Sequence, residues 1–417
     1  MAQLRLRRIF QNQNFYIQVV KYFSAFFVFS ENFLAARALS VSDYGQLSTA
    51  LQMATVFSMV GVGGGQAFLI HYFNSEVIHY RAYAICYLAQ YIGGLALLWS
   101  VQVLFFEVPP YYLSVFLAIP LGVNLILEPL LRVHRHFVLA LSFRSWLAFI
   151  PVFFYSYSIY FTKEPSLVAA LDTTMFSWGI GAFLFGVVSV LILKKRSRVN
   201  VFHVTFVNIK DHFIFYGGIF KQSLVPSLAT ALFVINLSID RLFLDKFYLG
   251  TDLGVYSLAF QLCTGASLFL STQTYLLGVR LGEIHKSKTS SGGLARELNA
   301  QLRTLSLQAL SILVLLCFGT YFLTLLVPKY GHLGPVVFVL GIGMFAPLVG
   351  GHGNYILQLR GDQKGVLLSY FYLIFAGVLL RFGVVLLKGP WINIVVSGSV
   401  LLVFHSLYLW FYVKRRL

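Results

Sequence analysis

Charged side chains are scarce in this chain. Asp, Glu, Lys and Arg make up 11% of its 417 residues, and only 14 of them are acidic. Soluble domains carry about 25% charged residues. Hydrophobic residues make up 58% of the sequence and the mean hydropathy is +0.79. This composition predicts a polytopic membrane protein, and the net charge of +17 therefore does not indicate a nucleic-acid partner.

Enzyme and ATPase motifs are also missing. The sequence has no HExxH, no GxSxG and no GxxxxGK[ST], and its ten histidines are scattered. The three cysteines, Cys86, Cys263 and Cys317, lie in apolar runs without metal-ligand spacing and are interpreted as small buried side chains. The longest stretches outside apolar runs, about 194–213 and 280–303, are too short for a nucleotide-binding domain. We therefore expect no catalytic residues, no metal and no cofactor.

Apolar runs long enough to cross a bilayer, roughly 17–25 residues each, predict about twelve transmembrane helices. They lie at about 15–39, 46–72, 82–106, 111–130, 138–161, 168–193, 214–238, 253–279, 304–327, 334–358, 366–388 and 392–413. The first run is too long for a signal-peptide core, so we expect it to remain as the first helix. An even number of helices places both termini on one side of the membrane.

The distribution of basic residues predicts which side that is. The termini and the loops on their side hold 21 of the 31 Lys and Arg residues. The opposite loops hold five, namely Lys163, Arg241, Lys246, Lys329 and Lys388. Because cytoplasmic loops are enriched in Lys and Arg, both termini are predicted to be cytoplasmic.

Two stretches 209 residues apart repeat one pattern without a gap. The matched pairs are Glu31 with Asp240, Arg37 with Lys246, Asp43 with Asp252, Gly45 with Gly254, Ser48 with Ser257 and Gln52 with Gln261. The sequence around Arg132 also matches that around Arg360. A duplicated membrane unit is typical of transporters that bind their substrate between the copies.

The repeat predicts a domain organisation. We expect an N-lobe at 1–200 and a C-lobe at 208–417, joined by a cytoplasmic linker at 194–213. Each lobe has six helices, so the copies share one orientation and are related by an axis along the membrane normal. A cavity is expected between them.

Several ionisable residues fall inside predicted spans, where a charge costs at least about 2.5–3.5 kcal/mol unless it faces a cavity or a partner. Lys21 and Glu31 share one stripe of the first helix with Ser24 and Val28. Lys221, Asn236 and Asp240 lie in the seventh predicted helix, and Arg144 and Arg381 lie in the fifth and eleventh. An alternative is that Glu31 and Asp240 only lock the two lobes together.

The Asp-x-Gly pairs have a structural interpretation. Asp43 with Gly45 and Asp252 with Gly254 are expected to form a turn in which Asp caps the following helix. The glycine-rich segment at 61–65 is interpreted as a place of close helix packing.

These segments resemble the prokaryotic polysaccharide-exporter (O-antigen flippase-like) family of the multidrug/oligosaccharidyl-lipid/polysaccharide (MOP) superfamily. The residues that carry the resemblance are Leu34 to Leu39, Asp43 to Gly45, Gly61 to Gly63, Asp240 to Leu244 and Gly250 to Ala259. The chain departs from that family's pattern at His71 and Arg381. The resemblance implies an all-α, V-shaped, MATE-like bundle in the bacterial cytoplasmic (inner) membrane.

The resemblance also implies a function, which is export of an undecaprenyl-pyrophosphate-linked oligosaccharide by alternating access. Its partners would be the bilayer, this anionic polyprenyl-pyrophosphate-linked glycan, and the polysaccharide polymerase and chain-length machinery. Our hypothesis is that four basic residues give the cavity a positive potential for the head group, and that three residues act in coupling or gating. The first set is Lys21, Arg144, Lys221 and Arg381, and the second is Glu31, Asp240 and Asn236.

Other functions compete with this one. A cation-coupled multidrug antiporter of the same superfamily would need an acid-dominated apolar pocket, and five basic residues inside the spans argue against it. A lipid II flippase is expected to have more than twelve spans, and a major-facilitator sugar transporter would need a Gly-rich basic loop near residues 74–81. A membrane-embedded glycan-modifying enzyme would need a long extramembrane loop with clustered acids or histidines.

Overall fold

The described part of the chain is helical. The computed structural model describes residues 2–62, 91–96, 112–133, 136–161, 165–197, 228–229, 231–286, 291–350, 357 and 362–416. The α-helices are α1 (Ala2–Ala38), α2 (Val41–Val62), α5 (Tyr112–Val133), α6 (Phe137–Phe161), α7 (Leu167–Ser197), α9 (Gly250–Lys286), α10 (Ser291–Leu326), α11 (Leu333–Gly350), α13 (Gln363–Leu386) and α14 (Ile392–Arg416). A further helical segment covers 231–247, and a short 3₁₀ helix covers Pro328–Tyr330. The predicted all-α class is confirmed.

Eight of the described helices are long and apolar enough to cross a membrane. The predicted spans at 82–106 and 214–238 lie largely outside the described residues, as does the glycine-rich segment beyond residue 62. The count of twelve helices therefore stays a prediction.

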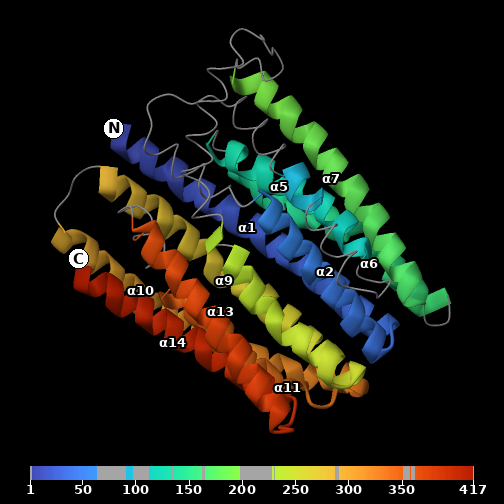
Figure 1. Cartoon of the computed structure of the whole chain (residues 1–417). Coiled ribbons are helices and arrows are strands. Elements are labelled where there is room, and N and C mark those ends of the chain that lie inside the picture. The colour runs from blue at the N-terminus through green and yellow to red at the C-terminus, as the bar shows by residue number, and fades with distance from the viewer. Residues whose placement is uncertain are drawn as a thin grey trace.

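The long helices lie side by side in one bundle, with both ends of the chain at the same end of it (Figure 1). In the first part of the chain α1 packs against α6, α2 against α5, and α7 against both α5 and α6. In the second part α11 packs against α9, α10 and α14. Helices α2 and α9 are in contact at the centre of the bundle and join the two parts. The exact lobe boundaries stay a prediction.

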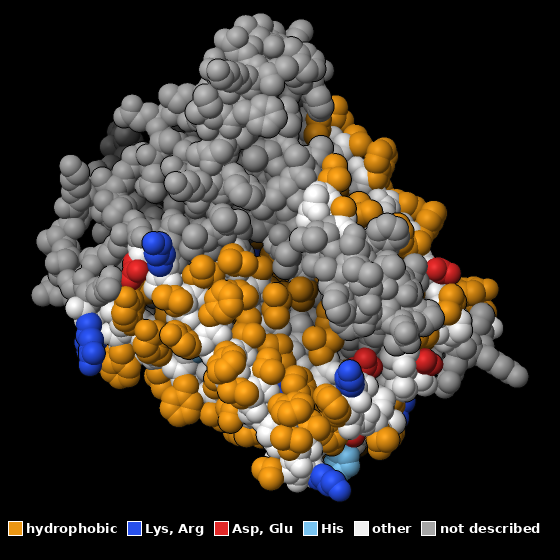
Figure 2. Space-filling view, in the orientation of Figure 1, with side chains coloured by type: hydrophobic (Ala, Val, Ile, Leu, Met, Phe, Trp, Pro, Cys, Tyr) orange, Lys and Arg blue, Asp and Glu red, His pale blue; other side chains and the backbone are white. Residues whose placement is uncertain are grey.

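The described surface suits a lipid environment. Figure 2 shows a broad field of hydrophobic side chains, with Lys, Arg, Asp and Glu gathered at its margins. On α10, for example, Phe318, Tyr321 and Leu325 are all more than half exposed. An apolar face this large would be unfavourable in water, and in a bilayer it contacts acyl chains.

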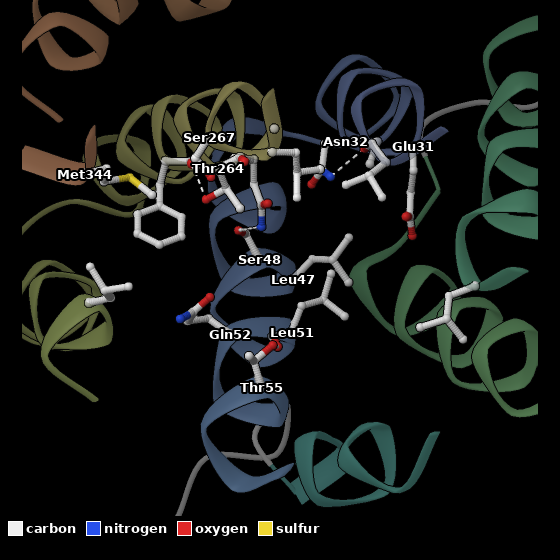
Figure 3. A pocket seen from close by; sticks show the side chains of 18 of the residues that line it. Glu31, Asn32, Leu47, Ser48, Leu51, Gln52, Thr55, Thr264, Ser267 and Met344 are labelled. Carbon is white, nitrogen blue, oxygen red and sulfur yellow. Dashed lines mark hydrogen bonds between the residues drawn. The ribbon is translucent and has the colours of Figure 1, made fainter. Parts of the chain in front are cut away.

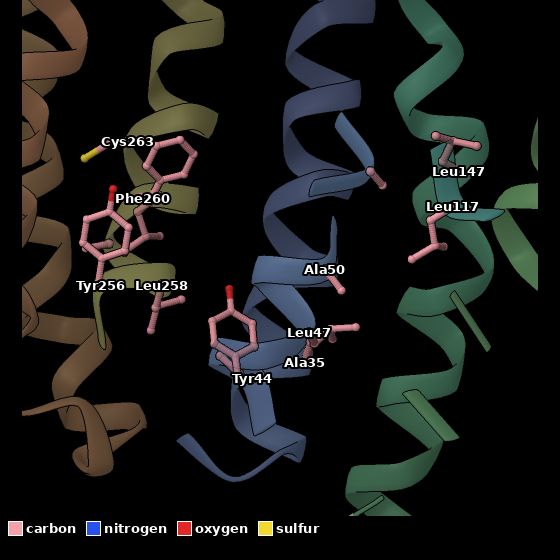
Figure 4. Packing of buried hydrophobic residues seen from close by; sticks show 14 of the residues in the cluster. Ala35, Tyr44, Leu47, Ala50, Leu117, Leu147, Tyr256, Leu258, Phe260 and Cys263 are labelled. Carbon is pink, nitrogen blue, oxygen red and sulfur yellow. The ribbon is translucent and has the colours of Figure 1, made fainter. Parts of the chain in front are cut away.

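One hydrophobic core runs through both parts of the chain. Figure 4 shows Tyr44 and Leu47 of α2 and Tyr256 and Phe260 of α9, which belong to the same buried cluster. The cluster continues through Leu147 of α6 into the first part of the bundle. The two parts are thus packed against each other along α2 and α9 in this conformation.

The start of α2 corrects one prediction. The helix begins at Val41, so Asp43 is its third residue and not its cap. Ser40 is the cap: its Oγ accepts from the backbone N–H of Asp43 at 3.1 Å and donates to Asp43 Oδ2 at 2.8 Å. Asp252 is likewise the third residue of α9. Both carboxylates instead lie in a first turn, where the helix dipole favours negative charge.

Candidate substrate site

A cavity of about 320 Å³ lies between the two parts of the bundle. Its walls come from α1, α2, α6, α7, the segment 231–247, α9 and α11, and Figure 3 shows side chains from several of these. Its polar lining residues are Glu31, Asn32, Tyr44, Ser48, Gln52, Thr55, Tyr155, Thr174, Trp178, Gln261, Thr264 and Ser267. The remainder of the wall is mainly aliphatic, with Phe233, Phe260 and Met344 as larger apolar members. The expected cavity between the repeats is therefore present.

The charge of this wall differs from the expectation. Glu31 is the one charged side chain among the described residues that line the cavity. Neither Lys21 nor Arg381 lines it. The side chain of Arg144 and the whole of Lys221 lie outside the described residues. The described wall thus shows an acidic group set among amides, hydroxyls and aromatic rings.

The α1 stripe that carries Lys21 and Glu31 faces protein along its length. Lys21 is only 9% exposed. One turn further on, Ser24 Oγ lies 2.6 Å from Ser145 Oγ of α6 and donates to a backbone carbonyl of the same helix. Val28 and Glu31 then reach the cavity. Burial of the stripe agrees with the cost of charge in hydrocarbon.

Two further side chains of the first part shape the cavity wall. Asn32 Nδ2 donates to the carbonyl of Val28 at 2.7 Å, and its Oδ1 accepts from Tyr44 Oη at 3.4 Å. The indole N–H of Trp178, a residue only 4% exposed, has no hydrogen-bond partner among the described residues. A buried donor without a partner is costly, so this N–H is available to an acceptor on a bound molecule or to water.

The second part of the bundle contains a buried ion pair. Arg381 Nε of α13 donates to Asp240 Oδ1, and Tyr256 Oη donates to Asp240 Oδ2 at 3.2 Å. Two glycines make room for it: a Cβ on Gly377 would lie 2.5 Å from Arg381 Nη1, and one on Gly398 would lie 2.7 Å from Asp240 Oδ2. The guanidinium predicted to bind a head group is therefore paired with the carboxylate predicted to act in coupling.

Asn236 lies beside this pair. An added Cβ on Gly377 would be 3.3 Å from Asn236 Oδ1, which places the amide near the same glycine as Arg381. Asn236 is buried, and neither of its side-chain polar atoms has a partner in the described structure. The three predicted residues Asn236, Asp240 and Arg381 thus form one cluster. Their transport roles stay predictions.

The two repeated glycines meet at the contact of α2 with α9, which we call the seam. A Cβ on Gly45 would lie 2.9 Å from the backbone nitrogen of Gly254. One on Gly254 would lie 2.0 Å from the carbonyl oxygen of Val41, and one on Gly250 would lie 2.3 Å from Ser42 Oγ. At Gly45 and Gly254 the obstacle is backbone, so only hydrogen fits and the two backbones can touch, whereas at Gly250 the nearest atom is a side-chain oxygen that can rotate away. Since α2 and α9 begin here, the seam is closed at the end of the bundle opposite to the termini.

Polar contacts continue the seam toward the cavity. Gln261 Nε2 donates to Ser48 Oγ at 3.4 Å, and Gln52 Nε2 donates to Ser238 Oγ at 3.0 Å. Arg241 Nη1 donates to the carbonyl of Ser48 at 3.1 Å. Three kinds of repeat residue therefore meet at the seam: Gly45 with Gly254 and Ser48 with Gln261, while Gln52 reaches Ser238, which lies outside the repeat.

A second connection between the parts holds the end of α1. Lys329 Nζ donates to the carbonyls of Leu39 at 2.5 Å and Arg37 at 3.2 Å. Tyr330 Oη donates to the carbonyl of Ala36 at 3.3 Å. Because the last carbonyls of a helix have no partner within it, these donors complete the bonding of α1 from a distant segment.

Arg241 differs from its prediction. The apolar run ends near residue 238 and predicts a loop for Arg241, but the helix continues to 247 and Arg241 is 0% exposed. Tyr155 and Trp178 were not singled out at all. Arg241 does stand in the repeated segment, which was the available signal. The two aromatic residues carried none, because this sequence is rich in aromatic residues throughout.

No family profile matches the sequence, and no curated protein matches it. Solved structures do. Lipid II flippase MurJ in its inward closed conformation has a TM-score of 0.66 at 14% identity, covering 95% of this chain and 87% of that one. The inward-facing conformation of a multidrug resistance MATE family transporter of the MOP superfamily has a TM-score of 0.62 at 13% identity, covering 96% and 98%. The outward-facing conformation of such a transporter has a TM-score of 0.60 at 14% identity, covering 97% and 96%.

At identities this low, the likeness to these structures establishes the fold alone. The chain is a multi-pass membrane protein with the helical fold shared by MATE transporters and the MurJ flippase. The expected MATE-like bundle is confirmed over nearly the whole chain. Each of these structural neighbours is a transporter or a flippase and none is an enzyme, which agrees with the lack of catalytic motifs.

Proposed function

We propose that this protein flips an undecaprenyl-pyrophosphate-linked oligosaccharide across the bacterial cytoplasmic membrane by alternating access. The observation that carries the proposal is the cavity between two repeated parts, which the seam borders at the end of the bundle opposite to the termini. With both termini cytoplasmic, that closed end faces outward. The structure would then represent the state before release to the outer leaflet.

The chemistry of the cavity wall supports an oligosaccharide cargo. Asn32, Gln52 and Gln261 supply amides that can both donate and accept hydrogen bonds, as sugar hydroxyls require. Trp178 and Tyr155 supply aromatic surface with polar tips. Apolar walls with a few convergent polar groups are typical of sites for small molecules. The likeness to a lipid II flippase supports a lipid-linked cargo as well.

The second candidate function is a cation-coupled multidrug antiporter. It is favoured by one observation, namely that Glu31 is the only charged side chain in the described wall. A buried carboxylate in an apolar cavity attracts an organic cation or a coupling ion. The likeness to multidrug resistance MATE transporters is in line with this function.

Transport by the purified protein in liposomes tests both functions. One set of vesicles carries a fluorescent undecaprenyl-pyrophosphate-linked disaccharide, and movement between leaflets is measured by its accessibility to a membrane-impermeant reductant. A second set contains ethidium and is subjected to a sodium or proton gradient. Movement of the glycolipid supports the flippase, whereas gradient-driven movement of ethidium alone supports the antiporter. Movement of neither overturns both.

A locked variant supplies the control. Ser42→Cys and Gly250→Cys place two thiols across the seam, where the Gly250 Cβ would lie 3.1 Å from that of Ser42. Disulfides need about 3.5–4.5 Å between Cβ atoms, so a small relaxation suffices. In a background without Cys86, Cys263 and Cys317, oxidation should stop transport and reduction should restore it. Transport that continues after complete oxidation would show that the seam does not open in the cycle.

A further inference from the structure

Arg241 occupies an unusual position on the seam. It belongs to the segment 231–247, is completely buried, and donates through Nη1 to the carbonyl of Ser48 on α2. Its guanidinium carbon lies 4.3 Å from the centre of the Phe260 ring on α9. This cation thus touches α2 on one side and α9 on the other, at the place where the two parts of the bundle meet.

Among the described residues, no carboxylate forms an ion pair with Arg241. Its Nε and Nη2 have no hydrogen-bond partner in the part of the chain that the structure describes. The neighbouring carboxylate of Asp240 already accepts from Arg381 and Tyr256. The Phe260 ring supplies a cation–π contact, which offsets only part of the cost of burying a charge. A buried charged group that lacks hydrogen-bond partners in one conformation is stabilised when a second conformation supplies a partner.

The second conformation would place Arg241 at the cavity. Ser48 and Phe260, the two residues that cover its guanidinium, both line the cavity. Figure 3 shows Ser48 on the cavity face of α2. When α2 and α9 separate, Ser48 and Phe260 move apart and uncover the guanidinium of Arg241. The N–H groups that lack partners then face the same space as Gln52 and Gln261.

We propose that Arg241 binds the pyrophosphate of the cargo in the state that is open at the seam. This inference rests on the proposed flippase function and adds a ligand to it. The planar guanidinium offers paired N–H groups that match two phosphate oxygens, and such charge-assisted pairs are strong in a site with little water. It also accounts for the lack of Lys and Arg in the described wall of the closed-seam state: the cation becomes available only when the exit opens.

Three variants test the proposal with the fluorescent undecaprenyl-pyrophosphate-linked disaccharide in liposomes. Arg241→Met removes the charge and keeps much of the side-chain length. Arg241→Lys keeps the charge and loses the paired N–H groups of the guanidinium. Arg303→Met removes an exposed arginine of α10 and is the matched control. Loss of a charged hydrogen bond predicts at least about a tenfold fall in translocation for Arg241→Met. Arg241→Lys should be intermediate, and Arg303→Met should match the wild type.

Disulfide formation between Ser42→Cys and Gly250→Cys, measured in each variant, separates head-group binding from a latch. If Arg241 binds the cargo, Arg241→Met loses transport while the seam oxidises at least as fast as in the wild type, because no charge is left to bury. Slower oxidation together with lost transport would overturn the proposal and make Arg241 a latch that holds the seam shut. Normal transport by Arg241→Met would overturn it as well. A wild type that does not move the disaccharide lipid would instead overturn the flippase function.

Discussion

Replacing Gly254 by alanine should open the seam. The new Cβ would lie 2.0 Å from the carbonyl oxygen of Val41 and 2.8 Å from its carbonyl carbon. Close carbon–oxygen contacts in proteins lie at about 3.3–3.6 Å, so α2 and α9 must move apart by roughly 1 Å at this point. The obstacle is backbone, which cannot rotate away as a side chain does.

The size of the effect follows from the cost of overpacking. Inserting a methyl group into a tightly packed site costs typically about 1–3 kcal/mol. That cost applies only while the seam is closed, so the ratio of closed to open molecules should fall by about 5–150-fold. Alanine also favours a helix over glycine by roughly 1 kcal/mol. This gain is the same in both conformations and therefore cancels from their ratio.

The assay is the rate of disulfide formation between Ser42→Cys and Gly250→Cys, with and without Gly254→Ala. The matched control is Gly319→Ala in α10, where an added Cβ meets nothing within 4 Å. We expect the initial oxidation rate to fall with Gly254→Ala and to stay unchanged with Gly319→Ala. An unchanged rate with Gly254→Ala would refute the claim that this glycine permits closure.

Two further predictions concern the buried charges. Arg381→Met leaves the Asp240 carboxylate buried without its cation and should lower the free energy of unfolding by about 3–5 kcal/mol. The double variant with Asp240→Asn should recover more than half of that loss in thermal unfolding in detergent, and equal melting of the single and double variants would contradict the pairing. Glu31→Gln should abolish the dependence of transport on a sodium or proton gradient while leaving transport without a gradient, because it removes the only charge of the described cavity wall. A variant that still responds to the gradient would show that coupling occurs elsewhere.

Much of the architecture could be predicted from local patterns. Apolar runs gave the all-α membrane class, because a backbone in hydrocarbon must satisfy its own hydrogen bonds. The repeat gave a cavity between two parts. It also singled out Gly45, Gly254, Ser48 and Gln261, although as turn and motif residues. Their real position, in contact with one another across the seam, is a tertiary property that the pattern does not contain.

The electrostatics of the site could not be predicted in the same way. Asp240 and Arg241 look like the end of a span because two adjacent charges lower the local hydropathy. The helix nevertheless continues, since Asp240 is neutralised by Arg381, 141 residues away in the chain, and Arg241 packs on Phe260. Hydropathy counts a charge at its full cost and does not register a partner from another helix. The prediction of a positive potential in the cavity likewise counted basic residues within spans without regard to their partners.

The bonding of the end of α1 has a consequence for biogenesis. Its final carbonyls accept from Lys329 and Tyr330, which follow them by 290 to 294 residues. Helix α1 therefore cannot acquire these hydrogen bonds until the segment with Lys329 and Tyr330 has been synthesised. A nascent chain that stops before this point would hold α1 in the bilayer with a loose end, which is a feature that membrane quality control could recognise.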